Sequence, residues 1–83
     1  MPLNMFHPAI LMVDLPEKGL YAGDVGTIVE RHTSPAVQQE GYSVEFFDMT
    51  GHTVAVVTVP ASSLREPTPA DRPAVRVLAK AAN

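Results

Sequence analysis

Three short segments with alternating apolar and polar side chains occupy the middle of this 83-residue chain. They span residues 25–32, 42–47 and 53–59 and are rich in β-branched residues, which favour strands. Residues 48–51 separate the last two segments, with an aspartate first and a glycine where a left-handed residue closes a hairpin. The pattern therefore predicts an all-β domain built from antiparallel strands.

Shorter segments complete the predicted sheet at both ends. Residues 9–13 are an apolar run without polar alternation, which predicts a strand covered on both sides. Residues 15–25 contain turn-forming proline and glycine, and predict an irregular excursion over one mouth of a barrel. Pro60 ends the fourth strand, after which residues 61–64 fit one 3₁₀ turn before a short last strand over 64–66.

The alternation also predicts which side chains face the core. In the segment 25–32, Val25, Thr27 and Val29 share the face that we expect to be the main one. Ile28 lies off that face, which indicates a bulge or a second buried surface. The expected core face of the next strand carries Tyr42, Val44 and Phe46.

Three prolines mark the end of the predicted barrel. Pro67, Pro69 and Pro73 cannot continue a hydrogen-bonded ladder, so we expect a linker after residue 66. Beyond it, Asp71 is placed to cap a short helix over residues 72–82, with apolar residues on one side and basic residues on the other. The chain thus divides into an N-terminal segment (1–8), a barrel (9–66) and a proline-rich linker with a basic tail (67–83).

Charge is unevenly distributed along the chain. Residues 1–70 carry three basic side chains against eight acidic ones, a net charge of −5, whereas residues 71–83 carry a net charge of +2. Nucleic-acid binding needs clustered basic side chains, and the cluster here is formed by Arg72, Arg76 and Lys80. These three residues are the candidate tail contacts, but the acidic body disfavours a nucleic-acid partner.

Cysteine is absent, so neither disulfides nor thiolate metal ligands stabilise this small domain. Its stability must come from apolar packing or from association. Residues 1–8 lack the features of a secretory signal, and no window reaches the roughly 18 apolar residues of a membrane span. We therefore expect a cytoplasmic protein without a membrane partner.

The order of these segments resembles that of the SH3-like barrel superfamily. The resemblance rests on the strand at 10–13, the loop ending in Gly23-Asp24, the strand at 26–31, the hairpin at Thr50-Gly51, and Val59-Pro60 before a 3₁₀ turn. More narrowly, residues 14–20, 23–30, 42–46 and 60–65 are similar to a bacterial family catalogued as domain of unknown function 4926, over roughly residues 9–66. The resemblance implies a small five-stranded SH3-like barrel and brings no activity with it.

The aromatic residues depart from those of signalling SH3 domains. The chain has no tryptophan and no tyrosine-rich run to line a groove, so recognition of polyproline ligands is not expected. Residues 23–29 are also similar to the glycine core of KOW-type ribosomal and transcription modules. Those modules are usually basic around this core, whereas Asp24 and Glu30 flank it here.

No group of residues in the sequence supplies a reaction or a metal site. The glycines of residues 19–26 fit no nucleotide-binding fingerprint, because neither a helix nor a lysine follows them, and we interpret them as structural. His7, His32 and His52 are far apart in the sequence, and the acidic residues form no pair at a spacing that forces proximity. We therefore expect no enzyme activity, no cofactor and no metal ion.

Apolar residues beyond the needs of a small core predict a contact surface. Hydrophobic residues make up 46% of the chain, and we expect Phe47, the N-terminal Leu3, Met5 and Phe6, and either Val54 and Val56 or their alternates outside the core. The competing interpretation is that the N-terminal segment and the tail fold back and cover this surface. We predict a noncatalytic interaction or assembly module that binds itself or a protein partner. The predicted contact residues are Tyr21, Phe47, Met49 and His52.

Two other functions remain open at this stage. One is a small nucleic-acid-binding or antitoxin-like regulator that uses Arg72, Arg76 and Lys80, and salt-dependent binding would distinguish it. The other is an accessory or maturation subunit of an enzyme, by analogy with the use of SH3-like barrels as appendages.

Overall fold

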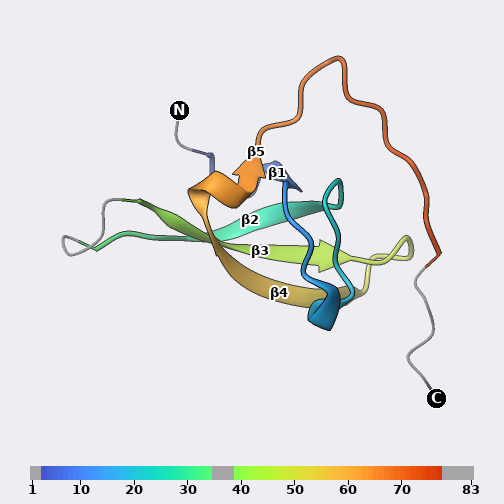
Figure 1. Ribbon diagram of the computed structural model, residues 1–83, viewed down its shortest axis with the longest axis horizontal. Helices are drawn as coiled ribbons and strands as arrows, with labels where there is room; N and C mark the ends of the chain where they lie inside the picture. The colour runs from blue at the N-terminus through green and yellow to red at the C-terminus, as the bar shows by residue number, and fades with distance from the viewer. Residues whose placement is uncertain (1–2, 35–38, 78–83) are drawn as a thin grey trace.

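A five-stranded antiparallel sheet forms the body of the protein (Figure 1). The computed structural model describes residues 3–34 and 39–77. Its strands are β1 (Pro8–Leu11), β2 (Val25–His32), β3 (Gly41–Phe47), β4 (Thr53–Pro60) and β5 (Leu64–Arg65), with 3₁₀ turns η1 (Pro16–Lys18) and η2 (Ala61–Ser63). The strands lie in the order β4-β3-β2-β1-β5. The prediction of a small, all-β, barrel-like fold with five strands is confirmed.

A tight turn joins β3 to β4. Gly51 has a φ of 92°, and its N–H donates to the Asp48 carbonyl over 3.1 Å. The Asp48 carboxylate accepts the backbone N–H groups of His52 and Thr50, each over 2.9 Å. These bonds, that of His52 first, lower the pKa of Asp48 because they stabilise its charged form. The predicted hairpin with a left-handed glycine is therefore confirmed.

β1 holds the sheet together by pairing on both of its sides. It pairs with β2 through Ile10 and Val25, and with β5 through Leu11 and Leu64. It is shorter than the predicted strand over 9–13, because the chain leaves the ladder after Leu11. The next two residues, Met12 and Val13, are exposed rather than covered on both sides.

The core lies between the inward face of the long strands and the segments that cross over it. Its fully packed side chains are Ala9, Leu11, Leu20, Ile28, Tyr42, Val44, Phe46, Val57, Val59 and Leu64. The predicted core face of β3 is therefore confirmed. The Tyr42 hydroxyl donates to the Glu40 carboxylate over 2.6 Å and accepts the Leu3 N–H over 3.2 Å, so it is satisfied at the edge of the core.

The predicted main face of β2 is wrong. Ile28 is fully buried opposite Val44, whereas Val25 is 50% exposed. The pairing of β2 with β3 shifts register between Ile28 and Glu30, so the strand carries the bulge that the position of Ile28 indicated. The residues with even numbers at the start of β2 face inward, and Val25 and Thr27 lie on the outer face.

Gly26 allows β2 to lie close against the side chains of β3. A Cβ atom at this position would lie 2.5 Å from Cγ1 of Val44 and 2.9 Å from the carbonyl oxygen of Glu45. Both distances are shorter than van der Waals contact. The absence of a side chain here is therefore a packing requirement, as the structural interpretation of the glycines predicted for this position.

Residues 66–77 form a segment that we call the strap, which arches away from the sheet and returns to it (Figure 1). The expected helix over 72–82 is wrong for residues 72–77, which have no helical structure, and residues 78–82 lie outside the described part. Pro73 disfavours a helical conformation in the residue before it. Asp71 caps no helix, because its carboxylate binds the Arg65 guanidinium over 2.7 and 2.9 Å.

Candidate functional site

β4 forms an open edge of the sheet. Within the described residues it pairs with β3 alone. The Ala61 N–H donates to the Glu40 carbonyl at the end of β4. From this bond, residues that are hydrogen-bonded to β3 alternate along β4 with residues that are not. Val57 is therefore hydrogen-bonded to β3, while the backbone groups of Val56 and Thr58 point away from it. Such unpaired donors and acceptors are a template for a further strand.

The side chains of β4 do nothing to block this edge. All eight residues of the strand are uncharged, and six of them are β-branched valine or threonine. Val54 and Val56 are about half exposed. Natural edge strands are usually protected by charges, prolines or bulges. Here Pro60 protects only the end of the strand, and one bulge lies at its start.

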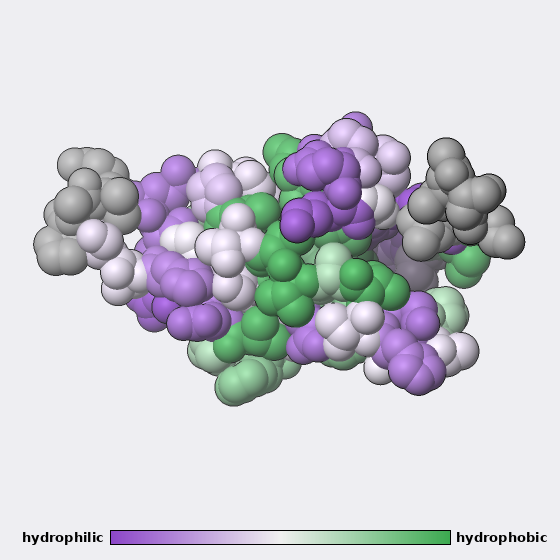
Figure 2. All heavy atoms as spheres, turned by 90° about the horizontal axis from the view of Figure 1, so that it is seen from below, coloured by the Kyte–Doolittle hydropathy of each residue, from purple (hydrophilic) through white to green (hydrophobic). Residues whose placement is uncertain are grey.

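A hollow runs beside this edge. It has a volume of about 230 Å³ and lies between β4 and the loop that carries η1. Its walls are Leu15, Glu17 and Lys18 from the loop and residues 56–59 from β4. Figure 2, which views the molecule from this side, shows apolar atoms across the middle of the face and polar atoms on both flanks. The edge thus offers both backbone pairing and an apolar recess.

The outer face of the sheet continues from the exposed valines of β4. Cross-strand pairs place Thr27, Glu45 and Val56 in one row over three strands. At one end of this face lie exposed apolar side chains, those of Val25, Phe47 and Val54. At the other end, the hydroxyl of Ser43 lies 2.7 Å from that of Thr58 and 2.8 Å from Nε2 of His32. The apolar end therefore adjoins the open edge.

Three of the four predicted contact residues lie on one hairpin. Phe47 ends β3 and is partly exposed, Met49 is 89% exposed at the tip, and the backbone N–H of His52 is held by Asp48. Tyr21 lies apart from them, on the loop before β2, where its ring faces the Arg76 guanidinium. The N-terminal apolar residues are divided: Leu3 packs against the core, whereas Met5 and Phe6 are exposed.

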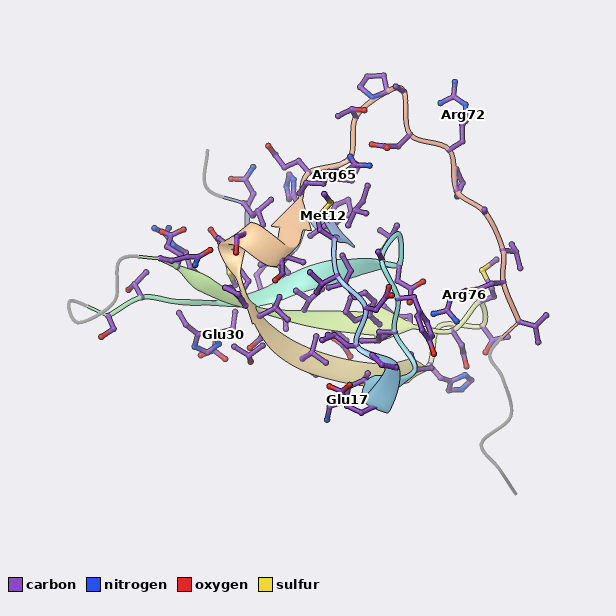
Figure 3. All side chains as sticks on the ribbon, in the orientation of Figure 1. Met12, Glu17, Glu30, Arg65, Arg72 and Arg76 are labelled. Atoms are coloured by element: carbon purple, nitrogen blue, oxygen red, sulfur yellow. The ribbon has the colours of Figure 1, made fainter. Side chains whose placement is uncertain are left out.

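The tail arginines make contacts within the chain (Figure 3). Arg76 pairs with Asp24 over 2.5 Å, and this bond is the first cause of the raised pKa of its guanidinium. Arg72 donates to the backbone carbonyls of Pro69 and Asp71 within the strap. Lys80 lies outside the described residues. The structure therefore does not leave Arg72 and Arg76 free to form a cluster.

The histidines are separated in space as well as in sequence. His7 precedes β1, His32 ends β2 and His52 lies on the β3–β4 turn. In the described ranges, no three histidine, aspartate or glutamate side chains gather in a way that could hold a metal ion. Over the same ranges, no helix has the length and apolar character needed to cross a membrane.

The fold and the surface together define a small all-β, barrel-like domain with an open sheet edge at β4 and an appended strap. Residues 5–66 match the model of the family described as domain of unknown function (DUF4926), and the chain belongs to this family. The match contains all five strands and ends where the strap begins. Neither curated proteins nor solved structures gave a match to the chain.

Two elements of this surface were missed by reasoning from the sequence. The pairing of Asp24 with Arg76 joins residues 52 positions apart, and no spacing rule predicts such a contact. The exposure of Val25 was missed because the strand was assigned the opposite inward face. The sequence did contain an indication of the inward face of β2. Ile28 shares its face with Gly26, and a glycine, which has no side chain, suits a face that packs closely against other residues.

Proposed function

We propose that this domain is an SH3-like barrel that acts as a noncatalytic protein-interaction module, with the β4 edge as its docking site. The strand order and the 3₁₀ turn before β5 support the SH3-like assignment. The observation that carries the function is an eight-residue, uncharged strand whose outer backbone groups have no ladder partner in the described part of the chain. An extended protein segment would join the sheet there as a sixth strand.

A second copy of β4 fits this edge well. In an antiparallel pairing centred on Val56, each Val54 lies opposite a Thr58 of the other copy. No like charges face one another across this pairing, since β4 carries none. The half-exposed valines of both copies then extend one outer face. We therefore propose self-association through two β4 strands related by a two-fold axis.

Val56→Lys tests this proposal. The side chain is 54% exposed on the outer face, so the substitution leaves the core intact and places two like charges opposite each other in the paired strands. Light scattering after size exclusion, over a concentration series, should show an assembly for the natural chain. The variant should dissociate at protein concentrations at least about tenfold higher, a change of about 1.4 kcal/mol.

Val77→Lys provides the matched control. It makes the same chemical change at a valine that is 90% exposed and belongs to the strap, outside β4. It should associate like the natural chain. The proposal of self-association is wrong if the natural chain is a monomer throughout the series, or if Val56→Lys and Val77→Lys behave alike.

The nucleic-acid-binding or antitoxin-like alternative has less support from these contacts. Arg72 and Arg76 are engaged within the chain, so a nucleic acid would compete with Asp24 for one of them. Binding of an RNA or DNA oligonucleotide that falls steeply with salt and is lost in Arg72→Gln/Arg76→Gln would favour it. An accessory-subunit role would use the same β4 edge with another protein as the sixth strand. The bacterial and cytoplasmic assignments also stay predictions.

A further inference from the structure

The strap is fixed to the body at two points of different character (Figure 3). At the first, the Asp71 carboxylate binds Arg65 and also accepts the Thr68 N–H over 2.6 Å, and the Asp71 N–H donates to the Thr68 carbonyl. These bonds close a turn over residues 68–71. At the second point the strap is extended and is held by the Arg76 side chain. Residues 72–77 can therefore leave the body while the turn stays in place.

The second anchor is a complete recognition site for a guanidinium group. Arg76 donates from Nη2 to Asp24 over 2.5 Å and to the Gly19 carbonyl over 3.1 Å. Its Nε donates to the other Asp24 oxygen over 3.3 Å. The guanidinium carbon lies 4.7 Å from the centre of the Tyr21 ring, within range of a cation–π interaction. A carboxylate, a carbonyl and an aromatic face thus converge on one arginine.

This anchor is open to water and has no support from the rest of the segment. The Arg76 side chain is 42% exposed and the Asp24 side chain 22%. In residues 72–77, Arg76 provides all of the hydrogen bonds to the body that involve described residues. Val75 and Val77 are exposed. Exposed ion pairs are weak and screened by salt, so another arginine can compete for this site.

The strap also covers the sheet incompletely. A cavity of about 570 Å³ lies between the arch and the body. Ile10 and Val25 contribute to its walls from the sheet, and Pro73 and Ala74 from the strap. Val25 stays half exposed beneath the arch. The small strap residues leave space that a larger apolar side chain would fill.

We propose that Asp24, Tyr21 and the Gly19 carbonyl, together with the adjoining apolar cavity, form a second docking site for an extended, arginine-bearing segment of a partner protein. The strap occupies this site within the chain and competes with the partner. The site residues lie inside the family match, whereas residues 67–77 of the strap lie beyond it. This site is distinct from the β4 edge and does not depend on it.

The turn over residues 68–71 favours a partner segment over exchange of straps between two copies. In an exchange, each strap would have to leave its own body at the end of β5 and extend to the other copy. The Arg65–Asp71 pair instead returns the chain to the residue from which the strap begins.

Peptide binding to strap-released protein tests the proposal. The probe is a fluorescein-labelled peptide with the sequence of residues 66–77, and binding is followed by fluorescence anisotropy at low salt. Full-length Arg76→Gln, whose own strap no longer occupies Asp24, should bind the peptide about tenfold more tightly than the natural chain, because the competitor is removed. A peptide carrying Ala74→Leu should bind several-fold more tightly still, since leucine fills the cavity.

Three matched changes identify the site. Arg72→Gln in the protein removes a strap arginine that does not touch the body, and should bind the peptide like the natural chain. Adding Asp24→Asn to Arg76→Gln keeps an acceptor for the Tyr21 N–H but removes the charge, and should weaken binding about tenfold. Arg76→Gln in the peptide should have a similar effect. Circular dichroism melts establish that each protein variant is folded.

The proposal is overturned if the peptide binds Arg76→Gln no better than the natural chain, or if Asp24→Asn leaves its affinity unchanged. Absence of binding to every variant also overturns it. Light scattering and anisotropy together separate this site from the β4 edge. Val56→Lys should lose self-association and bind the peptide like the natural chain, whereas Arg76→Gln should keep self-association and bind the peptide more tightly. An assembly of the natural chain that dissociates in Arg76→Gln would assign the site to strap exchange and overturn the partner proposal.

Discussion

The sheet and the strap are held in place by different interactions. In the sheet, apolar side chains such as Leu11, Ile28 and Val44 are fully buried, and β2 is hydrogen-bonded to β1 on one side and to β3 on the other. In the strap, the valines are exposed, and two arginine–carboxylate pairs provide the attachment. Apolar burial is insensitive to salt at moderate concentration, whereas exposed ion pairs are screened. The two regions should therefore separate in their responses to mutation and to solution conditions.

Gly26→Ala should have the largest effect on the sheet. Its Cβ atom would overlap Cγ1 of Val44 and the Glu45 carbonyl, and the backbone oxygen cannot move aside easily. We expect a loss of about 2 to 3 kcal/mol in the free energy of unfolding, measured in urea by circular dichroism. Gly41→Ala is the control, because its Cβ atom would lie 3.5 Å from the Val59 carbonyl oxygen, which is an ordinary van der Waals distance. Equal stability of the two variants would contradict the packing role of Gly26.

Tyr42→Phe should have a smaller effect, with a distinct dependence on pH. Loss of the hydroxyl removes the bonds to Glu40 and Leu3 and should cost about 1 kcal/mol. Burial, and then donation to Glu40, raise the pKa of Tyr42 above its ordinary value. A raised folded pKa contributes stability that is complete below the unfolded pKa of about 10 and is lost as the pH rises through the folded value.

Urea unfolding of both proteins between pH 7 and 11 measures this contribution. The stability difference between the natural chain and Tyr42→Phe should be constant up to about pH 10 and should narrow above it. If the stability difference stays constant throughout the alkaline range, the pKa of Tyr42 does not differ between the folded and unfolded states.

Asp71→Asn should have the smallest effect on global stability and a clear local one. The substitution weakens the first anchor, so the Thr68 amide should exchange with solvent about tenfold faster, while the unfolding midpoint of the sheet is unchanged. Glu66→Gln, which removes a neighbouring strap carboxylate, is the control. Equal protection of Thr68 in Asp71→Asn and the natural chain would show that the anchor does not hold the turn.

The same anchor has a predictable dependence on pH. Arg65, followed by the Thr68 N–H, lowers the pKa of Asp71 well below its ordinary value. A lowered folded pKa gives an interaction that is complete above the unfolded pKa of about 3.9 and is lost only as the pH falls through the folded value. Protection of the strap turn should therefore be unchanged from pH 7 to about pH 5 and should persist below pH 4.

The strands could be predicted from the sequence because their signals are local. The β-branched residues of β2 and the alternation around Tyr42 determine where strands form, and Gly51 determines the turn between β3 and β4. The inward face of β2 could not be assigned by alternation alone, because the bulge after Ile28 interrupts the period. The register with β3, which places Ile28 opposite Val44, decides the face instead.

The strap and the site beneath it could not be predicted for a different reason. The spacing of Val75, Leu78 and Ala82 in the sequence fits one side of a helix, but an isolated helix of about eleven residues is marginal without a surface to pack against. Ion pairing of Asp71 and Arg76 with residues of the body holds the chain extended instead. The open edge could be predicted only in part. The sequence indicates which apolar residues are exposed, but the position of β4 at the edge depends on the order of all five strands.

The pairing of β1 with β5 has a consequence for synthesis of the protein. β1 is made first among the strands, yet one of its two partners, at Leu64 and Arg65, is made last. The hairpin of β3 and β4 can form from neighbouring residues while the chain is still growing. The sheet cannot be completed until β5 has left the ribosome, so the core face of the β3–β4 hairpin, which includes Val44 and Val57, lacks its full cover until then. The interval between the emergence of β4 and that of β5 thus sets how long this apolar face is exposed to other nascent chains.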